Sequence, residues 1–236
     1  MRFDATRALI VYAGGLTLAA GWMLVTGAAA PTRVDTLDVR RINVREADGT
    51  IRMVIAARDR FPGLIVRRHE QPHPGRTDAA GMLFYNDEGT ENGGLIFGGQ
   101  AVAGKPTAFG HLSFDQYQQD QVVALDQSEA DGRRSAGLRI SDRPDAALDV
   151  AAIRRLDALP PAEREAAIGR MTASGAFGQS RAFFGKDRDG DALLDLHDGL
   201  GRTRLRLRVG KTGEGAGAAR IEFLDAAGAV TRTIGA

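Results

Sequence analysis

Turn-forming residues recur along this chain at short intervals and divide it into many short apolar segments. Asp-Gly or a close relative separates such segments at 48–49, 189–190, 198–199 and 227–228. Pairs of this kind supply the backbone conformations that tight hairpin turns require. The spacing predicts a repeated hairpin unit of about 20 residues whose sequence drifts along the chain.

Between these turns, the apolar and β-branched residues alternate with polar ones, as expected for half-buried strands. Expected strands cover 34–44, 50–56, 64–66, 82–85, 95–97, 122–125, 136–140, 181–185, 192–196, 203–209, 219–224 and 230–234. The sequence therefore predicts a mainly β protein, with an antiparallel β-sandwich or open barrel as its architecture. A propeller-like array of hairpins is the alternative.

One internal segment changes from period two to helical spacing. Leu148, Ile153 and Leu156 suit a short helix, and Pro160-Pro161 precedes a second one with acidic residues in its first turn. We expect a helical insertion or linker at 146–175 between β-rich segments at 31–145 and 176–236. The last segment is a meander that belongs to the same domain as the first.

Residues 8–30 form an uncharged, mostly apolar run of 23 residues. A helix of that length reaches across a hydrocarbon core of about 30 Å. Arg2 and Arg7 precede the run, and positive charge on this flank favours a cytoplasmic N-terminus. The sequence thus predicts a single-pass membrane protein, with residues 1–7 cytoplasmic and the main domain outside the cytoplasm.

A cleaved signal peptide is the alternative for this run, because three alanines at 28–30 resemble a small-residue cleavage site. The run is longer than a usual signal sequence, and Pro31 would follow the cut, so an uncleaved anchor is the first prediction. Gly14 and Gly21 lie seven residues apart, near one helix face, where another helix could approach closely. Trp22 could contact headgroups or that neighbour; a plain tether is the other interpretation.

The charge balance argues against a nucleic-acid partner. Lys and Arg number 31 against 30 Asp and Glu, which leaves a net charge of +1 and no long-range field. The absence of cysteine excludes disulfides, thiolate metal sites and cysteine nucleophiles.

No cofactor is expected. Residues 99–105 match the spacing of a phosphate-binding loop, but Pro106 stands where a magnesium-binding hydroxyl is needed. Asp187, Asp189 and Asp191 imitate the start of a calcium loop without its central glycine. His69 and His73 have the four-residue spacing of metal ligands on a helix, but the prolines on either side of His73 prevent a helix there.

An acidic and amide cluster is the best place for a ligand site. Its members are Asn86, Asp87, Glu88, Glu91 and Asn92. Such groups can act in acid-base chemistry or bind a hard cation, and Asp115, Asp120 and Asp126 lie further along the chain. Capping of a tight turn is the alternative role.

Alternating arginines mark the strand expected at 203–209. Arg202, Arg204, Arg206 and Arg208 share one face of it. They could form a partner surface, or they could pair with acids on neighbouring strands, for which Asp195 and Glu222 are placed.

The stretches GMLFYNDEGTENGGLIFGG, HLSFDQYQQDQ and ISDRPD resemble an uncharacterised family of bacterial membrane-anchored β-rich proteins. The resemblance extends from about Leu37 onward, and it implies a bacterial inner membrane as the compartment, with the main domain periplasmic, but no activity. We therefore expect a non-catalytic structural or accessory subunit of a larger membrane assembly, such as a respiratory or photosynthetic complex, with other membrane subunits and the bilayer as partners. The alternative is an anchored hydrolase or small-ligand-binding protein that uses the acidic cluster.

Overall fold

The chain forms two compact units, residues 1–39 and residues 40–236. The computed structural model describes residues 5–26, 33–73, 76, 78–212 and 217–235. The first unit contains helix α1 (Ala5–Thr26). A side chain at Gly14 or Gly21 would meet nothing within 4 Å, and Trp22 is exposed.

Among the helices of the described ranges, none combines the length and apolar character that a membrane crossing requires. Residues 27–30 of the expected anchor and residues 1–4 of its flank, Arg2 included, lie outside the described residues.

The second unit is dominated by one antiparallel sheet, here called the large sheet. Within the described residues it has twelve strands: β1 (Arg41–Arg45), β2 (Ile51–Ala56), β5 (Ala80–Tyr85), β6 (Glu91–Val102), β7 (Lys105–Asp115), β8 (Gln121–Ala130), β9 (Arg133–Asp142), β10 (Gln179–Lys186), β11 (Ala192–His197), β12 (Thr203–Val209), β13 (Arg220–Leu224) and β14 (Val230–Gly235). The expected mainly β, antiparallel class is confirmed.

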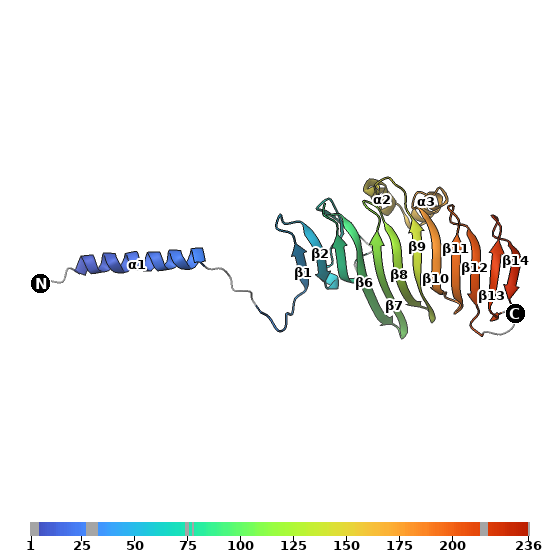
Figure 1. Ribbon diagram of the computed structural model, residues 1–236, viewed down its shortest axis with the longest axis horizontal. Helices are drawn as coiled ribbons and strands as arrows, with labels where there is room; N and C mark the ends of the chain where they lie inside the picture. Colours follow the sequence, from blue (N-terminus) through green and yellow to red (C-terminus); the bar gives the residue numbers. More distant parts are fainter. Residues whose placement is uncertain (1–4, 27–32, 74–75, 77, 213–216, 236) are drawn as a thin grey trace. The chain divides into compact units, whose positions relative to one another are not determined.

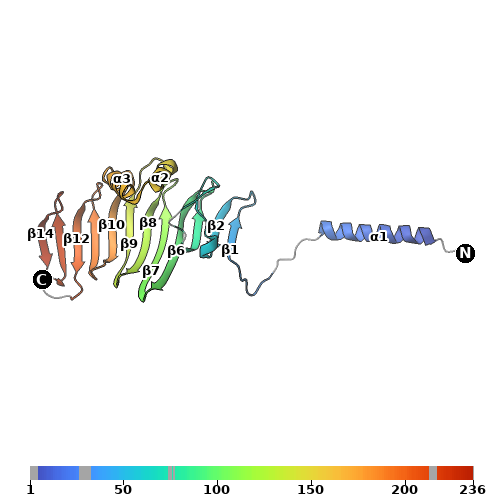
Figure 2. The ribbon, with the colours of Figure 1, turned by 180° about the vertical axis from the view of Figure 1, so that it is seen from behind.

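The strands of the large sheet follow one another in chain order from β1 to β14, with only β3 (Leu64–Val66) and β4 (His69–Gln71) leaving it to form a small hairpin. Figures 1 and 2 show this succession from both sides. Because each strand pairs with the next, the described chain builds an open sheet with free edges at β1 and β14. The described strands of one copy do not form the two layers of the expected sandwich, the curled sheet of the expected open barrel or the separate blades of a propeller-like array.

Two insertions interrupt the meander. The β2–β5 connection contains the 3-10 turn η1 (Arg58–Arg60) and the β3–β4 hairpin. Helices α2 (Val150–Asp157) and α3 (Pro161–Ala173) lie between β9 and β10, in the segment with helical spacing. Asp149 caps α2 by accepting a hydrogen bond from the Ala152 N–H, and Pro161 begins α3. Both helices lie at one end of the strands (Figure 1).

A five-residue turn recurs between neighbouring strands. Its first residue donates its N–H to the fifth carbonyl and accepts the N–H of the fourth, at 46–50, 86–90, 116–120, 187–191, 198–202 and 225–229. In four of these described turns the first side chain, Asn86, Asp187, Asp198 or Asp225, also accepts two backbone N–H groups. What recurs along the described chain is thus one type of five-residue turn that joins neighbouring strands.

Strand register divides the large sheet into two faces. One face, here called the mixed face, carries the row Asn43, Val54, Leu83, Gly94, Ser113, Ala124, Arg139, Phe183, Asp195, Arg206, Glu222 and Thr233. The β3–β4 hairpin covers one end of this face, where Ile65 packs with Val54, Ala56, Leu83 and Tyr85 in the hydrophobic core. Successive side chains alternate across a strand, so the next row lies on the opposite face.

Candidate functional site

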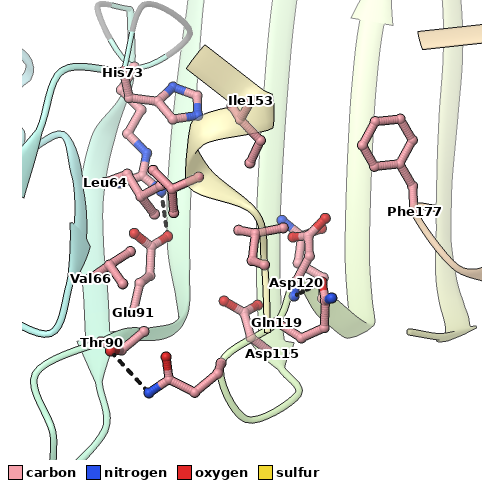
Figure 3. A pocket seen from close by; sticks show the side chains of 15 residues that line it. Leu64, Val66, His73, Thr90, Glu91, Asp115, Gln119, Asp120, Ile153 and Phe177 are labelled. Carbon is pink, nitrogen blue, oxygen red and sulfur yellow. Dashed lines mark hydrogen bonds and ion pairs between the residues drawn. The ribbon is translucent and has the colours of Figure 1, made fainter. Parts of the chain in front are cut away.

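A cavity of about 230 Å³ lies on the mixed face, between the β3–β4 hairpin and the start of α2 (Figure 3). Its apolar wall consists of Leu64, Val66, Leu148, Val150, Ile153 and Phe177. Its polar wall consists of His73, Arg76, Thr90, Glu91, Asp115, Gln118, Gln119, Asp120 and Gln121. Apolar walls with a few convergent polar groups are typical of small-molecule sites.

Backbone hydrogen bonds fix the two walls to the turns of the large sheet. The Arg68 N–H donates to the Gly89 carbonyl at 2.9 Å, which ties the β3–β4 hairpin to the 86–90 turn. The Leu148 N–H donates to the Gln118 carbonyl at 2.7 Å, which ties the approach to α2 to the 116–120 turn. The cavity therefore stands where both insertions meet the sheet.

Glu91 and Arg76 form an ion pair in the cavity, with side chains only 12% and 15% exposed. Arg76 also donates to the Gly63 carbonyl at 2.7 Å. The second Glu91 oxygen, Oε2, is buried and has no hydrogen-bond partner among the described residues. The pair is therefore anchored on its cationic side and leaves one acceptor free.

Asp115 presents a second buried acceptor, Oδ1, that lacks a partner in the described part of the chain. Burial, together with the nearby Glu91 and Asp120 carboxylates, raises the pKa of Asp115 to about 7. Asp120 pairs with Arg143 at 3.3 Å. Burial and the neighbouring Arg76 lower the pKa of His73, which favours its neutral form.

The predicted acidic and amide cluster is divided by the fold. Asn86 caps its own turn, Asp87 is 92% exposed and pairs with Arg52, and Glu88 accepts hydrogen bonds from the Tyr117 hydroxyl and the Gln118 amide. Asn92 lies at a register shift in β6, partly exposed. Of the cluster, only Glu91 lines the cavity.

Sequence reasoning missed the partners of Glu91. No sequence pattern marks Arg76, because it belongs to the β2–β5 connection, whose course the sequence does not indicate. The sequence places Asp115 among the acids further along the chain, and the structure shows that it ends β7 just before a turn. That position is the one signal that could have placed it beside Glu91, which begins the neighbouring strand.

Arg202, in the turn before β12, and the three arginines of β12 all form ion pairs within the chain. Arg206 lies opposite Asp195 and binds both of its carboxylate oxygens, at 2.7 and 2.6 Å. Arg208 pairs with Asp191, and Arg202 and Arg204 reach Asp198 at 2.8 and 3.5 Å. The expected cross-strand pairing with Asp195 is thus present.

The other motifs do not assemble a metal site: the described residues contain no group of three or more histidines and carboxylates suited to one. Asp187 caps its turn, and Asp189 pairs with Arg133. His111 Nδ1 lies 2.7 Å from Asp126 Oδ1, which accepts its hydrogen bond, and the buried Nε2 atom of His111 has no hydrogen-bond partner in the described structure. This histidine–aspartate pair therefore has no hydroxyl nucleophile within hydrogen-bonding reach.

The opposite face of the large sheet, here called the apolar face, has a different character. Its central row is Ile42, Ile55, Met82, Leu95, Leu112, Leu125, Leu138, Phe184, Leu194, Leu207, Ile221 and Ile234. The neighbouring row is Val44, Met53, Phe84, Gly93, Phe114, Val123, Ile140, Ala182, Leu196, Leu205, Phe223 and Arg232. Every member of the central row is apolar.

Many of these apolar side chains are open to solvent. Phe184 is 65% exposed, Leu125 53% and Phe114 51%. By contrast, Val54 and Leu83 on the mixed face are 0% and 2% exposed. The apolar face is thus built like the inner surface of a core, but the described chain leaves it largely uncovered.

No protein-family model matches the chain, and no curated protein matches it. The resemblance drawn from the sequence therefore remains a prediction.

Proposed function

We propose that this protein is a non-catalytic structural subunit of a membrane-anchored assembly and that its apolar face is the protein interface that holds the assembly together. The uninterrupted apolar central row carries this proposal. Monomeric soluble proteins rarely expose contiguous apolar patches larger than several hundred Å², and larger patches mark interaction sites.

Folding alone does not account for this row. An antiparallel sheet with one face in water normally carries polar residues on that face. Here Leu125, Leu138 and Phe184 lie side by side across three strands, each at least 36% exposed. Their removal from water by a partner would be favourable by about 25 cal/mol per Å² of apolar surface.

The membrane part of the proposal rests on the sequence of the first unit. Residues 8–30 carry no charge, and the 22-residue helix α1 (Ala5–Thr26) includes residues 8–26 of this run. We propose that this segment anchors the chain in a bacterial inner membrane, with the N-terminus cytoplasmic and the second unit periplasmic. Gly14, Gly21 and Trp22 would form its packing side toward other membrane subunits.

Mild extraction of the full chain from its native membranes, followed by light scattering, tests the assembly. We expect a particle heavier than one chain with its detergent. Migration as a single chain in every detergent would overturn the proposal. A reporter that is active only outside the cytoplasm, fused after Ala236, and the mass of the mature N-terminus test the anchor.

A second candidate function, binding of a small organic cation, is favoured by the free acceptors in the cavity. Three carboxylates, of Glu91, Asp115 and Asp120, face two guanidinium groups, of Arg76 and Arg143. When Asp115 is ionised, one positive charge is thus missing, and Glu91 Oε2 and Asp115 Oδ1 both lack a donor among the described residues. An ammonium group attached to an apolar body would meet both requirements.

Calorimetry with phenethylamine, and with phenylethanol as its uncharged counterpart, tests this second candidate. The amine is expected to bind and to lose affinity in Asp115→Asn, while Asp87→Asn, a change at an exposed acid outside the cavity, leaves it unaltered. Equal behaviour of the amine and the alcohol would rule out the cation site.

A further inference from the structure

We infer that the apolar face is covered by the apolar face of a second copy of this chain, so that two large sheets form one β-sandwich. This inference rests on the proposed function, because it names the occupant of the proposed interface. The sandwich expected from the sequence would then exist between two copies.

The size of the face fits such a dimer. Twelve strands spaced about 4.8 Å apart make a sheet about 55 Å wide, and two rows of side chains cover a band about 14 Å high. The product is about 770 Å² per copy, compared with about 800 Å² per partner in a stable interface of standard size. The band is therefore large enough for a stable dimer.

The charge distribution favours an identical partner. The central row has no charged member, and Arg232 is the single charged residue of the neighbouring row in the described strands. A partner of opposite charge would find nothing to recognise there. A two-fold interface, in which the same patch meets itself, needs only shape complementarity between uncharged surfaces.

The apolar face carries both large and small side chains, which a facing sheet could interdigitate with. Phe84 and Phe114 stack across Gly93 with ring centroids 6.3 Å apart, so this place on the face is a large position. Ala182, which lies between Ile140 and Leu196 on the flanking strands, is a small position. Interdigitation of large and small side chains is how two sheets pack about 10 Å apart in sandwiches.

The mixed face cannot serve in the same way. The β3–β4 hairpin and α2 occupy part of it, and its charged residues pair with one another, as Arg206 does with Asp195. The apolar face is therefore the side of the large sheet that is available to a second sheet.

The two sheets of a dimer overlap most when the two-fold axis, which lies between the two layers, passes through the middle of the sheet. This holds whether the axis runs along the strands or across them. The middle lies between β8 and β9, where Leu125 and Leu138 are register partners. These two positions should therefore lie close to the same positions of the second copy.

Because the chain has no cysteine, single-cysteine variants give an unambiguous test. Leu138→Cys in the full chain, in its native membranes, would be treated with a short bismaleimide, since facing sheets lie beyond the reach of a disulfide. Arg139→Cys, the next residue, points to the mixed face and is the matched control. We expect a covalent species of twice the chain mass for Leu138→Cys and at least tenfold less for Arg139→Cys.

Other results have distinct meanings. A product of Leu138→Cys with a different protein would overturn the second copy as occupant and leave the proposed interface standing. Ready labelling of both cysteines by a water-soluble maleimide, without crosslinked products, would overturn both. Protection of Leu138→Cys that depends on lipid alone, again without products, would identify a lipid surface and also overturn both.

A second pair of variants makes the test independent of crosslinking. Phe184 and Leu200 are both 65% exposed within one chain, but only Phe184 lies on the apolar face. We expect Phe184→Asp to halve the particle mass attributable to protein, and Leu200→Asp to leave it unchanged. Equal masses for these two variants would contradict the dimer.

Discussion

The two faces of the large sheet come from the same strands, but their side chains differ in how far they are buried within one chain. On the mixed face, Val54 and Leu83 are buried under a hairpin of the same chain, and charged residues such as Arg206 pair with partners on adjacent strands. On the apolar face, most of the central row stays exposed. The alternation of residues along the strands thus makes one face apolar, but the insertions of the described chain bury side chains only on the mixed face.

The largest expected difference lies between a charge placed on each face. Val54→Asp buries an unpaired carboxylate in a core position that is 0% exposed, and we expect it to cost more than about 4 kcal/mol of unfolding free energy. Phe184→Asp should retain the strand signal in circular dichroism. A folded Val54→Asp variant would show that the mixed face does not contain the core.

Removal of one partner of the buried ion pair should have the next largest effect. Arg76→Met leaves the Glu91 carboxylate buried without its cation, and we expect a loss of about 3 kcal/mol in chemical denaturation. The double variant Arg76→Met with Glu91→Met should recover much of this loss, because the isolated charge is gone. If the double variant is less stable than the single one, the ion pair itself holds the β3–β4 hairpin in place.

The pH dependence of stability should reveal Asp115. Its pKa is about 7 in the folded protein and about 3.9 when unfolded, so between these values the folded state holds one proton more. The contribution of Asp115 to the unfolding free energy should therefore fall as pH rises from 4 to 7, by at most about 1.4 kcal/mol per pH unit. His73, whose pKa is lowered, contributes in the opposite direction, so the slope of Asp115 is the difference between denaturation series of the native chain and of Asp115→Asn; equal slopes would contradict the raised pKa.

Much of the antiparallel β architecture can be predicted from local sequence patterns. The alternation in Arg204–Val209 places Arg206 opposite Asp195, and the Asp189-Gly190 pair marks a turn. Both features depend only on neighbours in sequence. For the same reason the helical segment between β9 and β10 was recognisable, since its apolar spacing and its prolines are local.

The site was less predictable because it depends on irregularities. Strict alternation back from Leu95 would put Glu91 on the apolar face. A register shift pairs Phe84 with Gly93 but Tyr85 with Glu91, which leaves Asn92 unpaired and turns Glu91 to the mixed face. Nor does any local pattern indicate that the β2–β5 connection returns Arg76 to this point, or whether a second layer comes from the same chain.

The smallest expected effect concerns a turn, which belongs to neither face and so gives a baseline for the comparison. Asp225 Oδ1 accepts the N–H groups of Ala227 and Ala229, both at 2.9 Å, at the turn between β13 and β14. Asp225→Ala removes this acceptor, and by analogy with lost helix caps we expect a cost of about 1 kcal/mol. Asp225→Asn keeps the acceptor, as Asn86 does in the equivalent turn, and should cost much less.

The mass of the dimer should not change in either variant, because neither substitution alters the register of β14 or the position of Ile234 on the apolar face. A cost for Asp225→Asn equal to that of Asp225→Ala would show that the charge, rather than the hydrogen-bond geometry, stabilises the turn.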